Sequence, residues 1–137
     1  MAVEKLRLLF VDDDTSFLRD LALVVRGPCE TARSYAEGIL VTTRPDVAFV
    51  DLGLPDGDGV QLIRELGARW PDVPFVALTV ARADERVLAA VRAGARGYLL
   101  KEDVGSRLER AVEEAMAGGS PMSPRIARAP QQITGRI

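Results

Sequence analysis

The sequence contains no histidine and only one cysteine, Cys29, among its 137 residues. The absence of histidine excludes Ser-His-Asp catalysis and imidazole general-base chemistry, and it removes the commonest zinc ligand. A single cysteine cannot form an intrachain disulfide, which suits a reducing compartment. Any reactive site must therefore consist of carboxylates, hydroxyls, lysine or a hard metal ion.

The chain also lacks long apolar runs and an excess of positive charge. No run approaches the roughly 18 residues that a membrane span needs, and the N-terminus lacks the apolar core and cleavage site of an export signal. We therefore expect a cytoplasmic protein that does not contact the membrane. The net charge is −2. Residues 118–137 contain three arginines and no acidic residue, so the residues before them carry a larger net negative charge. An acidic body argues against a nucleic-acid surface in this chain.

The length and the share of hydrophobic residues, 47%, are typical of one globular domain. Four short apolar runs indicate strands that are buried on both faces, namely Leu6–Val11, Val47–Val50, Phe75–Leu78 and Tyr98–Leu100. Segments with helical spacing alternate with them. A weaker pattern predicts an edge strand over Glu30–Ser34 and a short helix over Tyr35–Arg44. Five such β-α units predict a three-layer α/β domain with a parallel sheet.

Two helix starts can be predicted from capping residues. Asp14 is predicted as the N-cap of the first helix. The last helix is predicted over about Ser106 to Ala117, because Ser106 and Glu109 have the spacing of a capping box. Residues 118–137 contain three prolines and three glycines, which is typical of a linker or tail. The predicted domain therefore covers residues 1–117.

Polar residues stand where the buried runs end: Asp12, Asp13, Asp51, Thr79 and Lys101. The carboxyl ends of parallel strands share one sheet edge, where ligands bind. Close carboxylates repel one another unless a cation is present, and a set of oxygen ligands selects Mg²⁺ or Mn²⁺ over zinc. A lysine and a hydroxyl supply donors for a phosphoryl group. The pattern predicts a magnesium-dependent phosphoryl site with a carboxylate nucleophile.

Each residue alone also has a simpler interpretation. The aspartate pair suits a helix cap or solvated turn, Asp51 a turn, and Lys101 a solvated surface position. A second pattern, from Leu54 to Glu65, nearly matches a calcium-binding loop, but leucine occupies the first ligand position and Pro55 follows it. The coincidence that each group ends a separate buried run favours the shared phosphoryl site.

Four motifs together resemble the receiver domain of two-component response regulators. They are LLFVDDD (8–14), DLGLPDGDG (51–59), ALT (77–79) and AGARGYLLK (93–101), and the resemblance covers about residues 5–117. It implies a doubly wound (βα)5 flavodoxin-like sheet in the order 2-1-3-4-5. It also implies a bacterial signalling domain that catalyses only its own phosphorylation and dephosphorylation.

The resemblance assigns roles to the acidic residues. Asp51 would be the phosphoacceptor, which takes a phosphoryl group from the phosphohistidine of a sensor histidine kinase. Asp12 and Asp13 would bind Mg²⁺, with Asp51 and the backbone carbonyl of Gly53 completing the protein ligands.

By the same resemblance, Thr79 and Lys101 would bind the phosphoryl oxygens. Tyr98 has two interpretations. It is either an aromatic residue packed on the last strand or a rotamer switch, in which Thr79 shifts toward the phosphoryl group and Tyr98 turns inward behind it. Such a switch is a population shift driven by different contacts in the two states.

One departure from the family pattern concerns the output. Glu102 follows Lys101 where many receivers have proline, and GYLLKE is similar to receivers with a LuxR-type helix-turn-helix output. The resemblance therefore implies control of transcription through a DNA-binding domain that this chain does not contain, with a homodimer of the phosphorylated form. The chain is either cut from a longer regulator or a single-domain form. Four arginines on or beside the last two helices could form an interface, although solvated charge is the simpler interpretation: Arg86, Arg92, Arg96 and Arg107.

Val80 stands where the family usually has a small residue, and its two methyl groups should narrow access to the acyl phosphate. Neighbouring Ala81 offers no polar side chain that could steer a hydrolytic water. Val80→Ala is therefore expected to speed both labelling by acetyl phosphate and loss of the phosphoryl group. Unchanged rates of both reactions would contradict this hypothesis.

Two other classes of function compete with this interpretation. The first is an enzyme, either a carboxylate-nucleophile phosphatase or a glycosidase with paired acids. About 117 structured residues leave little chain for a substrate pocket, and turnover of a free phosphate ester would favour this class. The second is a pseudo-receiver that binds partners without phosphorylation. Asp51, Thr79 and Lys101 argue against it, and absence of Mg²⁺ binding would favour it.

Overall fold

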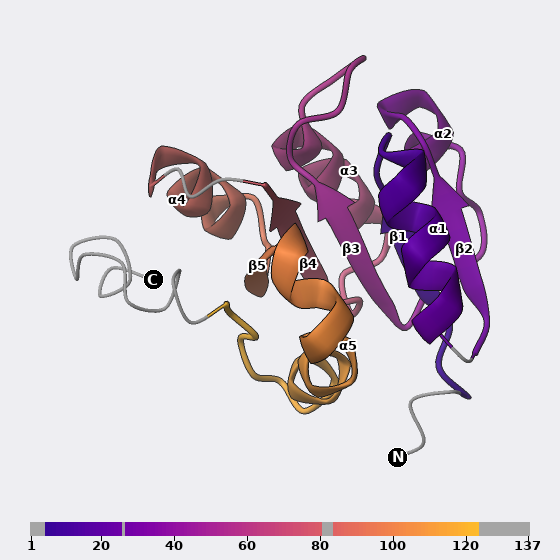
Figure 1. Ribbon diagram of the computed structural model, residues 1–137. Helices are drawn as coiled ribbons and strands as arrows, with labels where there is room; N and C mark the ends of the chain where they lie inside the picture. Colours follow the sequence, from indigo (N-terminus) through magenta and orange to yellow (C-terminus); the bar gives the residue numbers. More distant parts are fainter. Residues whose placement is uncertain (1–4, 26, 81–83, 124–137) are drawn as a thin grey trace.

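The central feature of the fold is a parallel sheet with the strand order β2-β1-β3-β4-β5 (Figure 1). The computed structural model describes residues 5–25, 27–80 and 84–123. The strands are β1 (Leu8–Val11), β2 (Cys29–Ala32), β3 (Val47–Asp51), β4 (Phe75–Thr79) and β5 (Gly97–Leu100). The helices are α1 (Thr15–Val24), α2 (Tyr35–Ile39), α3 (Gly59–Arg69), α4 (Asp84–Arg92) and α5 (Lys101–Met116). The predicted fold class and strand order are confirmed.

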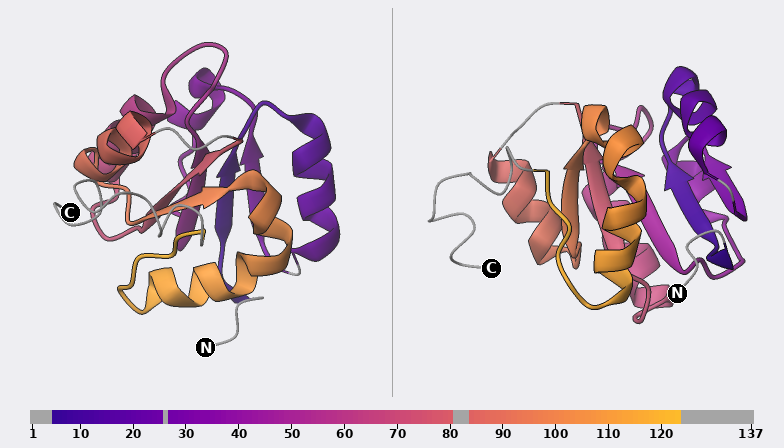
Figure 2. Two further views of the ribbon diagram at one scale, coloured as in Figure 1. Left: turned by 60° about the vertical axis from the view of Figure 1, so that its left-hand side comes forward. Right: turned by 60° about the horizontal axis from the view of Figure 1, so that its bottom comes forward.

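Helices cover both faces of the sheet and divide the core in two. Helices α1 and α5 lie on one face, and α2, α3 and α4 lie on the other (Figures 1 and 2). Successive residues of β1 point to opposite faces of the sheet: Phe10 packs toward α1 and α5, whereas Val11 packs toward α3. All residues of β1 and β3 are buried, which explains their continuous apolar runs. None of the helices in the described part of the chain has the length and apolarity that a membrane crossing requires.

The second β-α unit differs from its predicted bounds. Strand β2 covers Cys29–Ala32 rather than residues 30–34, because Ser34 already caps α2 through its Oγ, which accepts the Glu37 N–H at 3.1 Å. Helix α2 ends at Ile39 rather than at residue 44. The Val41 N–H bonds back to the Gly38 carbonyl in a tighter turn, and this turn buries the Val41 side chain.

Helix α5 begins at Lys101, so the prediction of a start near Ser106 is wrong. Val104 is fully buried and extends the apolar stripe of the helix by one turn toward β5. Glu102 and Asp103 place negative charge in the first turn, where the helix dipole favours it. Ser106 lies inside the helix, and its hydroxyl donates to the Asp103 carbonyl at 3.3 Å. Lys101 therefore directly follows β5, at the edge of the sheet.

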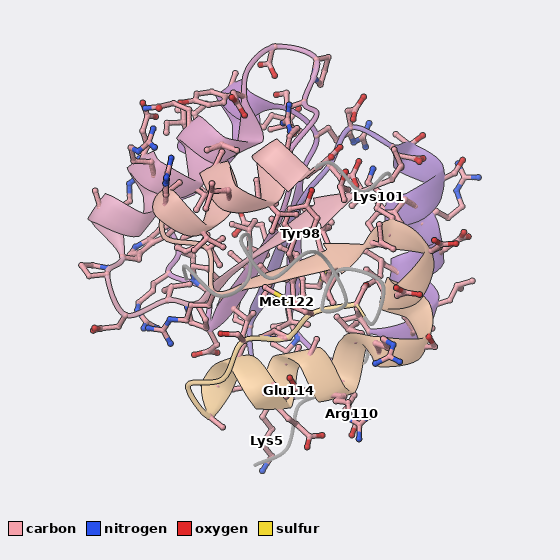
Figure 3. The ribbon with its side chains drawn as sticks, turned by 90° about the vertical axis from the view of Figure 1, so that its left-hand side faces the viewer. Lys5, Tyr98, Lys101, Arg110, Glu114 and Met122 are labelled. Atoms are coloured by element: carbon pink, nitrogen blue, oxygen red, sulfur yellow. The ribbon has the colours of Figure 1, made fainter. Side chains whose placement is uncertain are left out.

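Residues 118–123, here called the edge segment, fold back from α5 onto β5 (Figure 2). The Tyr98 N–H donates to the Pro121 carbonyl at 3.0 Å, and the Ser123 N–H donates to the Tyr98 carbonyl at 3.2 Å. Met122 forms a parallel bridge with Tyr98 and packs against the core (Figure 3). The first six residues of the predicted linker or tail thus pack along β5, which they meet in one isolated bridge, and residues 124–137 lie outside the described residues.

Ser123 anchors this edge segment. Its side chain is fully buried, and its Oγ accepts the Leu100 N–H at 2.9 Å. Ser123→Ala leaves that N–H buried without its acceptor, so we expect the free energy of unfolding to fall by about 1–3 kcal/mol. Chemical denaturation measures the change. Ser120→Ala, at an exposed serine of the same segment, is the control, and equal stabilities of the two variants would show that the Ser123 contact contributes nothing.

Candidate functional site

The strand register brings four of the predicted site residues to one edge of the sheet. Asp51 ends β3 and pairs with Leu78, and Thr79 ends β4 and pairs with Leu100. Asp12 follows β1, and Lys101 follows β5. The Lys101 ammonium meets both carboxylates, with Nζ 2.9 Å from Asp12 Oδ1 and 3.3 Å from Asp51 Oδ2. Residues that are 50 and 89 positions from Lys101 in the sequence therefore share one site.

This ion cluster is largely shielded from water. Asp12 is fully buried, Asp51 is 6% exposed, and the Lys101 side chain is 11% exposed. The Lys101 ammonium also lies 5.2 Å from the centroid of the Phe17 ring, on the first turn of α1. At the start of α5 the helix dipole disfavours a cation. The two carboxylates offset this cost, so the folded chain holds Lys101 in place by electrostatics.

The buried position of Asp12 changes its protonation. Burial raises the pKa of Asp12 to about 6, although the hydrogen bonds from Lys101 and from the Asp14 N–H act to lower it. Burial also acts to lower the pKa of Lys101, but its hydrogen bond to Asp12 and the charges of Asp12 and Asp51 raise it overall. Lys101 therefore stays protonated at neutral pH, and Asp12 is a carboxylate that a second cation would favour in its charged form.

Three carboxylates fit a hard divalent cation. Asp12, Asp13 and Asp51 each offer an oxygen within 4.8 Å of the others. The buried Asp12 Oδ2 lies 2.7 Å from Lys101 Nζ but accepts no hydrogen bond from the described residues. Gly53 adjoins the cluster, because its N–H donates to Asp51 Oδ1 at 3.0 Å. This all-oxygen donor set, with an unsatisfied buried carboxylate oxygen, is the kind that Mg²⁺ or Mn²⁺ prefers.

An open cleft of about 580 Å³ leads from solvent to the cluster. Its lining includes Asp13, Asp51, Thr79, Val80, Arg86 and Lys101. Val80 is 78% exposed and lines this cleft, and its role in access stays a prediction. The access prediction for Ala81 falls outside the described residues.

Arg86 is a site residue that the sequence patterns did not identify, since a charged residue on a helix usually faces solvent. Its Nη2 donates to the Leu52 carbonyl at 2.5 Å and lies 3.5 Å from Asp58 Oδ1. Helix α4 thus reaches the residue that follows Asp51.

Tyr98 is completely buried against the core. Burial raises the pKa of its phenol, whereas the Thr79 hydroxyl and the positive charge of Arg86 act to lower it. The ring therefore occupies the inward position, close to Thr79, which fits both interpretations of the sequence. The proposed switch between two positions stays a prediction.

The calcium-loop pattern has a structural explanation. Asp56 accepts the Tyr35 and Ala36 N–H groups at 2.7 and 3.1 Å, which caps α2. Asp58 caps α3 by accepting the Val60 N–H at 2.9 Å. These carboxylates serve as helix caps. The prediction that Asp14 caps α1 is likewise confirmed, because its Oδ1 accepts the Phe17 N–H at 3.1 Å.

Comparisons with known proteins agree with this geometry. Residues 8–113 match the family model of the response regulator receiver domain. The chain is 44% identical over 100 residues to the DNA-binding transcriptional activator DevR/DosR of Mycobacterium tuberculosis, covering 72% of this chain and 46% of that protein. This chain therefore spans about half the length of that regulator.

Two solved structures are similar over most of the chain. One is a LuxR-family two-component response regulator from Aurantimonas sp. SI85-9A1, with a TM-score of 0.83, 27% identity, and coverage of 96% of this chain and 97% of that one. The other is the BeF3-activated DrrB receiver domain, with a TM-score of 0.70, 26% identity, and coverage of 80% and 98%. The matched family model, the sheet order and the clustered carboxylates lead to one conclusion: the chain belongs to the receiver domain family of two-component response regulators.

Proposed function

We propose that Asp51 is the phosphoacceptor of this receiver domain and takes its phosphoryl group from a sensor histidine kinase. The observation that carries this proposal is the Lys101 ammonium, which lies between Asp12 and Asp51 at the end of an open cleft. In the reaction a carboxylate oxygen of Asp51 bonds to phosphorus while the bond from phosphorus to the imidazole nitrogen of the donor breaks. The product is an acyl phosphate on Asp51, and the imidazole leaves with the electron pair.

The residues around Asp51 have different electrostatic roles. Lys101 balances negative charge on the acceptor and on the transferred oxygens, and the Thr79 hydroxyl at the end of β4 donates to the same group. The Gly53 N–H orients the Asp51 carboxylate through its 3.0 Å hydrogen bond. The strand ends fix the positions of these hydrogen-bond donors before a phosphodonor arrives.

Asp12, Asp13 and Asp51 would hold Mg²⁺, with the Gly53 carbonyl as a further ligand and Mn²⁺ as a substitute ion. When bound, the ion supplies positive charge that offsets the carboxylates and the phosphoryl oxygens. Asp12 provides the buried part of this site and Asp13 the exposed part.

Labelling with a small phosphodonor tests the proposal. The protein is incubated with acetyl phosphate in the presence of Mg²⁺ or of a chelator, and phosphoryl transfer is followed by intact mass spectrometry. We expect one phosphoryl group per chain with Mg²⁺, and none with the chelator or in Asp51→Asn. Asp20→Asn makes the same charge change at an exposed position of α1 and should label like the wild type. Undiminished labelling of Asp51→Asn would remove the assigned acceptor.

Metal binding is expected to depend on pH through Asp12. Its pKa of about 6 without metal means that a proton competes with Mg²⁺ at low pH, so the affinity should fall by about tenfold between pH 7.5 and pH 5. Calorimetric titration with Mg²⁺ at the two pH values measures this ratio. An affinity that does not change between them would contradict the burial argument for Asp12.

The stability of the metal-free protein should show the opposite trend. The pKa of Asp12 is raised above its ordinary value of 3.8 in the folded state, so the folded state binds more protons than the unfolded state between about pH 4 and pH 6. The contribution of Asp12 to stability therefore falls as the pH rises through this range, and bound Mg²⁺ should offset the loss.

The family and its regulators support a proposal for the wider role of the domain. We place the phosphorylated domain, residues 1–117 with the edge segment packed on it, in control of transcription through a DNA-binding output domain beyond this chain, with a homodimer as the active state. Support comes from DevR/DosR, a DNA-binding activator that shares 44% identity with the matched region. The proposal also places the protein in the cytoplasm, with a receiver role limited to its own phosphorylation and dephosphorylation.

A further inference from the structure

Arg86 links helix α4 to the peptide that follows the acceptor. Its Nη2 donates to the Leu52 carbonyl at 2.5 Å, and the same carbonyl accepts the Gly59 N–H at 3.2 Å. Leu52 comes directly after Asp51, so two helices hold this peptide from different directions: α3 through Gly59 and α4 through Arg86. The guanidinium is thereby fixed close to the acceptor.

Arg86 and Lys101 occupy different depths of the same cleft. The Lys101 side chain is 11% exposed, and its ammonium is engaged by two carboxylates. The Arg86 side chain is 44% exposed, and within the described residues its guanidinium donates one hydrogen bond out of five available N–H donors. Lys101 is thus a buried cation between two carboxylates. Arg86 is a rim cation whose ion-pair partner, Asp58 at 3.5 Å, is itself exposed, and its other N–H groups donate to none of the described residues.

The charge balance of the cleft calls for such a cation. Asp13 and Asp51 line the cleft, and Asp58 lies at the Arg86 guanidinium, so the entrance repels an anion that carries two negative charges. The charge of Lys101 is already shared by Asp12 and Asp51. A planar guanidinium at the rim can bind two phosphoryl oxygens at once, which an ammonium does less well.

We propose that Arg86 binds the phosphoryl oxygens of the incoming phosphodonor and so sets the affinity of the cleft for it. The hydrogen bond to the Leu52 carbonyl keeps the guanidinium in place, and its other N–H groups donate to the phosphoryl oxygens. This inference rests on the proposed phosphoacceptor function of Asp51 and adds the residue that recognises the donor at the entrance.

The test measures initial rates of Asp51 labelling against the concentration of acetyl phosphate, with Mg²⁺ at saturation. In Arg86→Gln we expect the half-saturating donor concentration to rise about tenfold, since a hydrogen bond between charged groups is lost. The maximal rate should stay within about twofold of the wild type. Arg86→Lys keeps the positive charge but loses the planar guanidinium that can bind two oxygens at once. Its half-saturating donor concentration should therefore lie between those of the wild type and Arg86→Gln. Arg92→Gln makes the same charge change in the last turn of α4 and should match the wild type.

Ionic strength provides a second readout that a merely structural contact would not change. Salt should weaken donor binding to the wild type more than to Arg86→Gln, because the variant lacks the rim charge. Arg86→Lys gives the same salt comparison if Arg86→Gln does not fold. An unchanged half-saturating concentration and an unchanged salt dependence in the folded variants would overturn the inference and leave the labelling of Asp51 intact. Failure of the wild type itself to label would instead overturn the proposed function.

Discussion

Lys101→Ala is expected to slow the labelling of Asp51 by about 100-fold or more. The Lys101 ammonium lies 3.3 Å from Asp51 Oδ2 in a cluster that is almost closed to water, and removal of one preorganised donor from such a site typically costs a factor of 10² to 10³. The rate of phosphoryl incorporation at saturating acetyl phosphate and Mg²⁺ measures the effect.

The same substitution should also alter Asp12. Without the ammonium, which lowers its pKa, Asp12 is expected to take up a proton at a pH above 6 and to bind Mg²⁺ less well at neutral pH. Lys5→Ala removes a lysine from an exposed position and is the control for loss of one positive charge. Labelling of Lys101→Ala within twofold of this control would show that the ammonium does not act on the transferred group.

Gly59→Ala is expected to destabilise the domain by about 3 kcal/mol or more. A Cβ atom at Gly59 would lie 2.1 Å from the Asp51 carbonyl oxygen and 2.6 Å from Leu52 Cα. Both are backbone atoms at the end of the central strand β3, so relief requires α3 to move away from the acceptor. That movement also breaks the hydrogen bond from the Gly59 N–H to the Leu52 carbonyl, and overpacking of this kind usually costs 1–3 kcal/mol by itself.

The chain offers a matched control for this prediction in the same helix. A Cβ at Gly67 would have no atom within 4 Å, so Gly67→Ala should stabilise the domain by about 0.5–1 kcal/mol through higher helix propensity. Chemical denaturation of the two variants measures both changes. Equal effects of the two substitutions would show that α3 does not pack on the acceptor strand as tightly as the structure indicates.

Much of the site could be predicted because it depends on strand ends. Asp12 follows the apolar residues LLFV, Asp51 follows VAFV and Lys101 follows YLL, and such runs indicate strands that are buried on both faces. Once these strands are parallel, their carboxyl ends must meet. The contacts of Lys101 with two distant carboxylates were therefore implied by hydrophobic patterning.

The features that sequence reasoning missed depend on tertiary placement. Arg86 reaches Leu52 only because α4 packs beside the β3–α3 connection, and no local pattern marks one arginine of a helix as different from another. The edge segment pairs with β5 through Tyr98 backbone groups, which any residues could supply. The capping-box spacing at Ser106 was misleading, because burial of Val104 outweighs a local cap in setting the start of α5.

The most direct test of the account is a crystal structure of the protein grown with Mg²⁺ and beryllium fluoride, which mimics a bound phosphoryl group. The account predicts beryllium bonded to an Asp51 carboxylate oxygen, a metal ion on the Asp12 and Asp13 carboxylates, and fluorine atoms in contact with Lys101 and Thr79. A structure with both reagents present in which Asp51 is unmodified, or in which the metal binds away from the two aspartates, would contradict it.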